Sequence, residues 1–302
     1  MPASPDTAPE PVTGTWLSQG LELNYLDWGN GGAEPLLLVH GMWDHARSWD
    51  RVAAALCDHW RVIVPDLRGH GDSAWSPEGA YLAPYYLVDF VELVNALGLE
   101  RFSIIAHSFG GNPAARYAAL YPDRVKRLVL IDAMGPTKAV LARWEQEGPV
   151  SRTRDWVHRR LGNDKPSRLF AAVDDAAAKL MKNNKLLERE QALHLALHGL
   201  RREGDGYRWK YDPAIGNLAP EDFAIDLAHY WREITAPTLL CWGPASWTTD
   251  PATDGSAACF RNASTLTFDR SAHWIHHEQF EEFVEAVSRF LQNPAARGGS
   301  NP

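Results

Sequence analysis

The chain has 302 residues, of which 45% are hydrophobic and 23% are charged, and its formal net charge is −8. A chain of this length and composition buries a large core, which excludes disorder as the default state. Charges of both signs are mixed along the sequence, so we expect no nucleic-acid partner and no membrane partner. The composition leaves a homo-oligomer open.

The cysteines and the N-terminus bear on the cellular compartment. Cys57, Cys241 and Cys259 are an odd set with no short-spaced pair, which argues against a disulfide framework and a zinc site. The first residues lack the positive segment and the apolar segment of a signal peptide, and later apolar runs are too short to span a membrane. We expect a soluble, cytoplasmic protein.

The predicted strands follow in chain order after a short tail at residues 1–12, which is rich in Pro and Ala. An amphipathic hairpin around residues 20–26 predicts antiparallel edge strands. Short apolar runs follow at residues 35–39, 61–64, 102–105, 128–131, 238–241 and 264–268. Runs that are apolar at nearly every position suit strands covered on both faces, so they predict a mainly parallel sheet flanked by helices.

The alternation of strands and helices is interrupted between residues 135 and 233, where helical patterns follow one another without a convincing strand. This predicts a helical cap inserted into an α/β core of residues 13–134 and 234–292, and residues 293–302 form a second tail. Ligands of open α/β sheets bind beyond the carboxyl ends of the strands. Residues directly after the apolar runs are therefore the candidates for chemistry.

A serine stands at the sharpest predicted turn. The strand at residues 102–105 leads into Ala-His-Ser-Phe-Gly-Gly at residues 106–111, and a helical pattern follows at once. A strand, a tight turn and a helix with serine at the apex are typical of a nucleophile elbow, which presents the hydroxyl above the sheet. Ala106 stands where the commonest form of this motif has glycine, so one extra methyl group must be accommodated.

Three further motifs occur in the order that this type of fold requires. They are His40-Gly41-Met42, residues 66–73 (Asp-Leu-Arg-Gly-His-Gly-Asp-Ser) and Ser271-Ala272-His273-Trp274. With them, the sequence resembles the capped α/β-hydrolases over about residues 15–292. Residues 44–49, 209–213 and 246–247 are most similar to a bacterial subgroup whose substrates are uncharacterised. The resemblance implies an α/β-hydrolase fold (class α/β) without a cofactor.

The hydroxyl of Ser108 needs a base, because serine is a weak nucleophile near neutral pH. His273 follows the last predicted strand and precedes a helix at residues 279–291, so it can lie opposite Ser108; His276 and His277 are the nearest rivals. Backbone N–H groups serve best as oxyanion donors. Phe109, the residue after the nucleophile, supplies one, and the resemblance implies Met42 as the other.

Three positions are open for the acid of the expected triad. Many relatives carry it a few residues beyond a glycine like Gly243, but residues 243–247 contain no carboxylate. Asp132, at the end of the strand at residues 128–131, is the alternative that some members of the fold use, and we favour it. Asp250 and Asp254 stay open as alternatives, although turn formation or helix capping also explains them.

Aromatic residues suggest the substrate class. The chain has thirteen tryptophans, several of them near the predicted site. We expect a pocket lined by His40, Trp43, His107, Trp247 and Trp274, with His107 packing rather than reacting. Aromatic walls favour an apolar or cyclic acyl group.

The predicted activity is therefore hydrolysis of a small-molecule carboxylic ester or lactone. A serine nucleophile speaks against epoxide hydrolysis and dehalogenation, where the family uses aspartate. A carbon-carbon bond hydrolase, a perhydrolase and a ligand-binding pseudoenzyme remain alternatives, because fold does not fix function. His194 and His198 have a helical spacing of four but lack the intervening Glu of a zinc protease, so we expect no metal.

Overall fold

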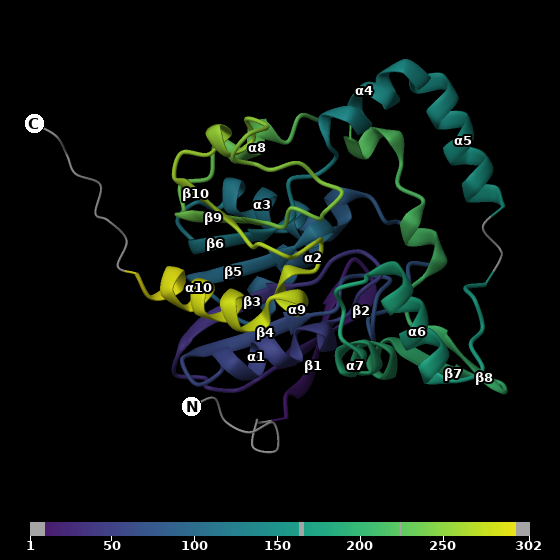
Figure 1. Ribbon diagram of the computed structural model, residues 1–302, viewed down its shortest axis with the longest axis horizontal. Helices are drawn as coiled ribbons and strands as arrows, with labels where there is room; N and C mark the ends of the chain where they lie inside the picture. Colours follow the sequence, from purple (N-terminus) through teal and green to yellow (C-terminus); the bar gives the residue numbers. More distant parts are fainter. Residues whose placement is uncertain (1–9, 163–165, 224, 294–302) are drawn as a thin grey trace, which may run out of the picture.

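An eight-stranded sheet forms the centre of the protein (Figure 1). The computed structural model describes residues 10–162, 166–223 and 225–293. The sheet order is β1-β2-β4-β3-β5-β6-β9-β10. Its strands are β1 (Val12–Ser18), β2 (Leu21–Asp27), β3 (Glu34–Val39), β4 (Trp60–Pro65), β5 (Phe102–His107), β6 (Val125–Ile131), β9 (Thr238–Trp242) and β10 (Ala263–Thr267).

The pairing confirms the predicted mainly parallel α/β sheet with an antiparallel edge. β1 pairs antiparallel with β2, and β2 pairs antiparallel with β4. The remaining pairs, from β4 to β10, are all parallel. The carboxyl ends of β3, β5, β6 and β9 therefore lie at the same edge of the sheet, which brings the loops after them together.

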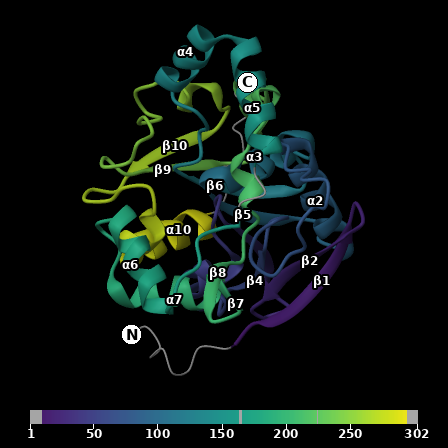
Figure 2. The same cartoon turned by 90° about the vertical axis from the view of Figure 1, so that its right-hand side faces the viewer.

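Helices cover both faces of this sheet, which explains why its strands are apolar at nearly every position. Successive side chains of a strand point to opposite faces. Leu37 and Val39 of β3 accordingly join one hydrophobic core, and Leu36 and Leu38 join the other. The first core is closed by α2 (Ala83–Ala96), α3 (Gly111–Leu120) and α8 (Ala228–Trp231), and the second by α1 (Asp50–Leu56) and α10 (Phe280–Gln292). Figure 2 shows α2 and α3 on one side of the sheet and α10 on the other.

The segment between β6 and β9 contains four longer helices and a small hairpin. The helices are α4 (Lys138–Glu147), α5 (Pro149–Leu161), α6 (Val173–Asn183) and α7 (Arg189–Gly199). The hairpin joins β7 (Leu200–Glu203) to β8 (Gly206–Trp209), so the prediction that this segment lacks strands is wrong. Its strands have four residues each, and Arg201, Arg202 and Glu203 are exposed, which leaves no apolar pattern to detect.

This inserted segment has a core of its own and several contacts with the rest of the protein. Buried residues of α6, α7 and β7 form a third cluster, against which Trp274 packs. Polar contacts to the rest of the protein include the Asn184 amide donating to Glu278 at 2.7 Å and the Tyr81 hydroxyl donating to Asp212 at 2.5 Å. In contrast, α4 and α5 bury no residue, and Figure 1 shows them projecting from the body at the upper right.

The structure also bears on the predicted tails at the two ends of the chain and on the predicted absence of a membrane-spanning segment. The predicted tails, residues 1–12 and 293–302, fall largely outside the described residues, and β1 already begins at Val12. No helix in the described ranges is both long enough and apolar enough to cross a bilayer. Cys57, Cys241 and Cys259 are free thiols.

Candidate active site

Ser108 lies at the turn between β5 and α3, as the elbow pattern predicts. It begins a single turn of 3-10 helix, Ser108–Gly110, and has a positive φ of 50°. This conformation is unfavourable for a residue with a side chain and is enriched at functional sites. Gly110 is needed here, because an added Cβ would lie 2.4 Å from the carbonyl oxygen of His40. Ala106 is fully buried, so the turn accommodates its extra methyl group.

His273 links Ser108 to Asp132. Its Nε2 lies 2.9 Å from the Ser108 Oγ, and its Nδ1 is hydrogen-bonded to the Oδ2 of Asp132. With the proton on Nδ1, the ring donates to the carboxylate and accepts from the hydroxyl. The Asp132 side chain is 1% exposed and that of His273 is 23% exposed, so the carboxylate is sealed while the imidazole reaches solvent. Three residues from three distant parts of the chain thus form one continuous hydrogen-bonded series.

Asp132 is fixed by the loop that follows β9. It directly follows β6 with a φ of 48°, and its backbone N–H donates to the carbonyl of Cys241 at 2.9 Å. The hydroxyl of Ser246 donates to its Oδ2 at 2.5 Å, and the hydroxyl of Thr248 donates to its Oδ1. We call Ser246 and Thr248 the hydroxyl pair. The loop after β9 therefore supplies two donors to a carboxylate that comes from β6.

The alternative acids close local turns. The Asp250 carboxylate accepts from the backbone N–H of Ala252 at 2.9 Å. Asp254 accepts from the N–H of Ser256 at 2.8 Å and from the hydroxyl of Thr249 at 2.7 Å. It is Asp132 that contacts the imidazole of His273.

The two predicted oxyanion donors border Ser108. An added Cβ on Gly41 would lie 3.1 Å from the Cβ of Ser108, so the backbone that leads into Met42 passes directly beside the nucleophile. Phe109 follows Ser108, and its ring packs edge-on against Tyr86 with centroids 4.9 Å apart. Met42 and Phe109 are both half-buried. Their backbones are therefore held close to the hydroxyl by packing.

His40 and His107 do not line a substrate pocket as expected, because both rings are buried. The Nε2 of His40 accepts from the backbone N–H of Leu67 at 3.0 Å, and the Nε2 of His107 lies 2.9 Å from the carbonyl oxygen of His273. Burial lowers the pKa of both rings well below the usual value, so they are neutral near pH 7. Their role is to hold the backbone of the loops around the site.

The three predicted pocket tryptophans differ in exposure. Trp247 is 63% exposed, and its ring centroid lies 5.4 Å from that of His273. Trp43 is 56% exposed, has a φ of 64°, and lies over Gly216, where an added Cβ would be 3.1 Å from its ring. Trp274 is half-buried against the inserted segment. Exposed aromatic surface is thus present beside the imidazole.

The rival histidines of the same loop are structural. His276 is 1% exposed and stacks on Trp49 with centroids 4.5 Å apart. Both of its ring nitrogens are buried without a hydrogen-bond partner among the described residues. His277 is 7% exposed and lies 3.3 Å from the Gln191 amide. Burial lowers the pKa of both rings, so neither is a solvent-accessible base.

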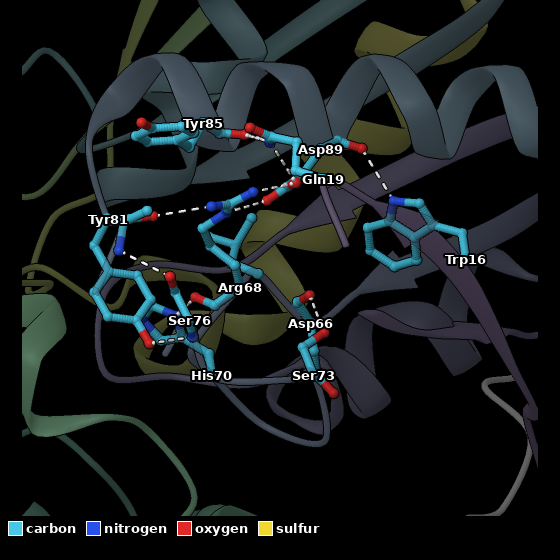
Figure 3. Close-up of polar contacts among 12 residues, drawn as sticks. Trp16, Gln19, Asp66, Arg68, His70, Ser73, Ser76, Tyr81, Tyr85 and Asp89 are labelled. Atoms are coloured by element: carbon cyan, nitrogen blue, oxygen red, sulfur yellow. Dashed lines mark hydrogen bonds and ion pairs between the residues drawn. The ribbon is translucent and has the colours of Figure 1, made fainter. Parts of the chain in front are cut away.

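Residues 66–73 build a buried turn next to the loop after β3. Arg68 donates to both carboxylate oxygens of Asp89 at 2.5 and 2.6 Å and to the carbonyl of Ala80 (Figure 3). The Ser73 hydroxyl donates to the carbonyl of Asp66 at 2.7 Å. The Asp66 carboxylate in turn accepts from the N–H of Ala46 at 2.6 Å, which ties this turn to the loop after β3.

Sequence reasoning missed the hydroxyl pair and the raised pKa values of two carboxyl groups in the loops after β3 and β4. Ser246 and Thr248 lie in the loop after Gly243, where we expected a carboxylate. Their position in that loop was the available signal for a contact with the triad. Asp44 follows Trp43, and burial raises the pKa of its carboxyl to about 7. Burial likewise raises the pKa of Asp66 to about 6.

Comparison with known proteins gives a family match and informative relatives. The family described as alpha/beta hydrolase fold matches residues 34–280. A serine hydrolase-like protein of Danio rerio is 31% identical over 210 residues, which cover 68% of this chain and 60% of that protein. This chain therefore spans less than two thirds of that relative.

Two further relatives align over almost the whole chain. The sn-1-specific diacylglycerol lipase of Mus musculus is 26% identical over 278 residues, covering 90% of this chain and 85% of the lipase. The 2-hydroxy-6-oxo-2,4-heptadienoate hydrolase of Pseudomonas putida is 29% identical over 284 residues, covering 91% and 94%. The name of the mouse protein states an ester substrate, a diacylglycerol. The name of the Pseudomonas putida protein states a different substrate, 2-hydroxy-6-oxo-2,4-heptadienoate.

Proposed function

The chain belongs to the α/β-hydrolase fold family, and on that premise we propose that it cleaves a carboxylic ester or lactone with Ser108 as the nucleophile. The observation that supports this proposal is the series Ser108–His273–Asp132, in which one imidazole contacts both the hydroxyl and the carboxylate. A hydroxyl paired in this way with a base, and a base oriented by a third group, is the arrangement that acyl transfer requires.

In the proposed reaction, the Oγ of Ser108 attacks the substrate carbonyl carbon while the Nε2 of His273 takes the hydroxyl proton. The tetrahedral intermediate collapses when the imidazolium returns that proton to the leaving alcohol oxygen, which leaves an acyl group on Ser108. Water then repeats the sequence and releases the acid. The backbone N–H groups of Met42 and Phe109 stabilise the oxyanion in both halves.

In this proposed cycle Asp132 holds the imidazole with its proton on Nδ1 and stabilises the imidazolium that forms. A carboxylate that is 1% exposed is costly to bury unless hydrogen bonds replace its hydration. The hydroxyl pair provides two such bonds in addition to the one from His273. Ser246 and Thr248 therefore act through Asp132 as positioning residues.

We also propose that the inserted segment, residues 135–233, acts as a cap and that Trp43 and Trp247 form part of the substrate wall. Trp43 lies over Gly216 of the inserted segment, and Trp247 lies beside His273. Exposed aromatic rings favour an apolar acyl group. Esters of apolar acids, such as lipid esters, are therefore the expected substrates.

The test is hydrolysis of a panel of p-nitrophenyl esters and simple lactones by the full chain. Ser108→Ala should abolish turnover, and Asp132→Asn should lower kcat about ten-thousandfold, as expected when the triad carboxylate is lost. Asp250→Asn is the matched control, because loss of a turn contact costs about 1 kcal/mol of stability and little activity. Turnover that survives Ser108→Ala would refute the mechanism.

A second candidate is hydrolysis of a carbon-carbon bond on the same three residues. Its specific support is the relative from Pseudomonas putida, which aligns over 91% of this chain. Turnover of a ring-cleavage product with no turnover of any ester in the panel would favour it. A purely ligand-binding protein was an alternative because the loop after Gly243 lacks an acid, and the contact between Asp132 and His273 weighs against it.

A further inference from the structure

Three potential metal ligands meet where the inserted segment contacts the core. Asp50 is the first residue of α1, and His194 and His198 lie one turn apart on α7. The two imidazole rings are 4.6 Å apart between centroids, and the Nε2 of His194 lies 3.2 Å from the Oδ2 of Asp50. One ligand atom from each residue lies within 4.8 Å of the other two.

The residue types of this cluster suit a metal. Two imidazoles and one carboxylate are a common protein ligand set for zinc, with water in the fourth position.

The carboxylate of Asp50 is incompletely satisfied. Asp50 is 8% exposed, and its Oδ1 is buried without a hydrogen-bond partner among the described residues. Its Oδ2 faces His194 and also lies 2.7 Å from the Nε of Arg47. A buried carboxylate oxygen without a donor is costly, and a cation bound between α1 and α7 would relieve that cost.

We propose that Asp50, His194 and His198 form a binding site for a divalent transition metal ion, such as zinc, that ties the inserted segment to the core. The bound ion takes the place of Arg47 beside the carboxylate and of the Arg47 carbonyl, 3.0 Å away, as the partner of the His194 Nε2. Zinc bonds of about 2.0 Å require the ligand atoms to approach to about 3.3 Å from each other, which side-chain rotation can provide. We expected no metal because the two histidines of α7 lack a third ligand nearby in the sequence. In the fold, Asp50 of α1 supplies that third ligand.

The first test is zinc binding by the full chain after treatment with a chelator, measured by competition with a fluorescent zinc indicator. The wild type should bind one zinc ion per chain. His194→Ala and His198→Ala should each weaken binding at least tenfold, since even loss of an outer partner of a metal ligand costs roughly ten- to hundredfold. His158→Ala and His229→Ala remove exposed histidines elsewhere and should bind zinc like the wild type.

The second test uses the competing cation. Arg47→Gln removes a positive charge next to Asp50 and keeps all three ligands, so zinc binding should tighten by about tenfold. Zinc should also raise the Tm of the wild type and of Ser108→Ala, but not of His194→Ala or His198→Ala. Circular dichroism of each metal-free variant checks that it folds. Wild-type affinity in both histidine variants, or weaker binding by Arg47→Gln, would overturn the proposed site.

Discussion

Acidification from pH 7 to pH 5 should remove much of the stability of this protein, because six of its histidines are buried. They are His40, His45, His70, His107, His276 and His277, none more than 7% exposed. Burial is the largest cause of a lowered pKa at every one of them. A neutral imidazole in the folded protein becomes a charged one when the chain unfolds at low pH.

The magnitude follows from three of these residues. The pKa is lowered to about 3 for His45 and His277 and to about 4 for His70, from an ordinary value of 6.5. Above pH 6.5 these imidazoles are neutral in the folded and in the unfolded chain, so they leave the free energy of unfolding unchanged. As the pH falls from 6.5 toward 3 to 4, the unfolded chain binds protons that the folded chain does not, and the free energy of unfolding decreases. At pH 5 each of the three histidines lowers the free energy of unfolding by about 2 kcal/mol, or by about 6 kcal/mol together. The other three histidines act in the same direction.

Two desolvated carboxyl groups oppose this loss. The pKa of Asp44 is raised to about 7 and that of Asp66 to about 6, so the folded protein binds protons there more tightly than the unfolded chain does. On acidification from pH 7 to pH 5, these two groups together raise the free energy of unfolding by about 4 kcal/mol. The balance is still a loss of several kcal/mol, a large part of the 5–15 kcal/mol that is typical of a folded domain.

The assay is urea unfolding at pH 7, 6 and 5, followed by tryptophan fluorescence, with the free energy of unfolding as the measured quantity. His276→Phe is the matched variant, because the ring of His276 stacks on Trp49 and its nitrogens have no hydrogen-bond partner in the described ranges. This variant should lose less stability than the wild type between pH 7 and pH 5. A free energy of unfolding that stays constant across this range, or an equal slope in His276→Phe, would refute the reasoning.

Three further predictions concern the site and its support. Ser246→Ala and Thr248→Val should each lower kcat/KM for a p-nitrophenyl ester at least tenfold, since a hydrogen bond to a charged group is worth about 1.5–3 kcal/mol; unchanged turnover in both would show that Asp132 needs neither hydroxyl. Gly110→Ala should lower the free energy of unfolding by about 1–3 kcal/mol or more because its Cβ would meet the carbonyl of His40, whereas Gly31→Ala, with open space around it, should not; equal stability in urea would contradict this. Arg68→Met should lower the free energy of unfolding by about 3–5 kcal/mol, because it leaves the buried carboxylate of Asp89 without its ion-pair partner, and adding Asp89→Leu should restore much of that loss. No recovery of stability in the double variant would argue against the ion pair as the cause.

The sheet and the three residues of the candidate triad could be predicted from local sequence patterns. Strands β3, β4, β5, β6 and β9 are buried on both faces, so each is marked by a continuous apolar run. Ser108 and Asp132 directly follow two of these strands, and His273 lies in the loop after β10, where a parallel sheet gathers its loops. Position relative to a strand end was enough to find them.

The supporting residues could not be predicted, because their roles depend on distant backbone. His40 and His107 belong to recognisable motifs, yet the groups that they bind are Leu67 and the carbonyl of His273, 27 and 166 residues away along the chain. A histidine next to a predicted nucleophile is equally compatible with a pocket wall and with the core. The hydroxyl pair was missed for the same reason, since a serine and a threonine in a loop show no sign of the carboxylate that they contact.

The short contact between Ser246 and Asp132 has a consequence for how such a site can evolve. The Oγ of Ser246 and the Oδ2 of Asp132 are 2.5 Å apart, so the two positions can exchange acid and hydroxyl while the imidazole keeps an acceptor nearby. A lineage that moves the acid by single substitutions must pass through an intermediate with two carboxylates or with none. Two carboxylates at this separation would share one proton, and none would leave the imidazole without its acceptor. The location of the acid is therefore a trait that ancestry tends to preserve, even though either strand end could supply it.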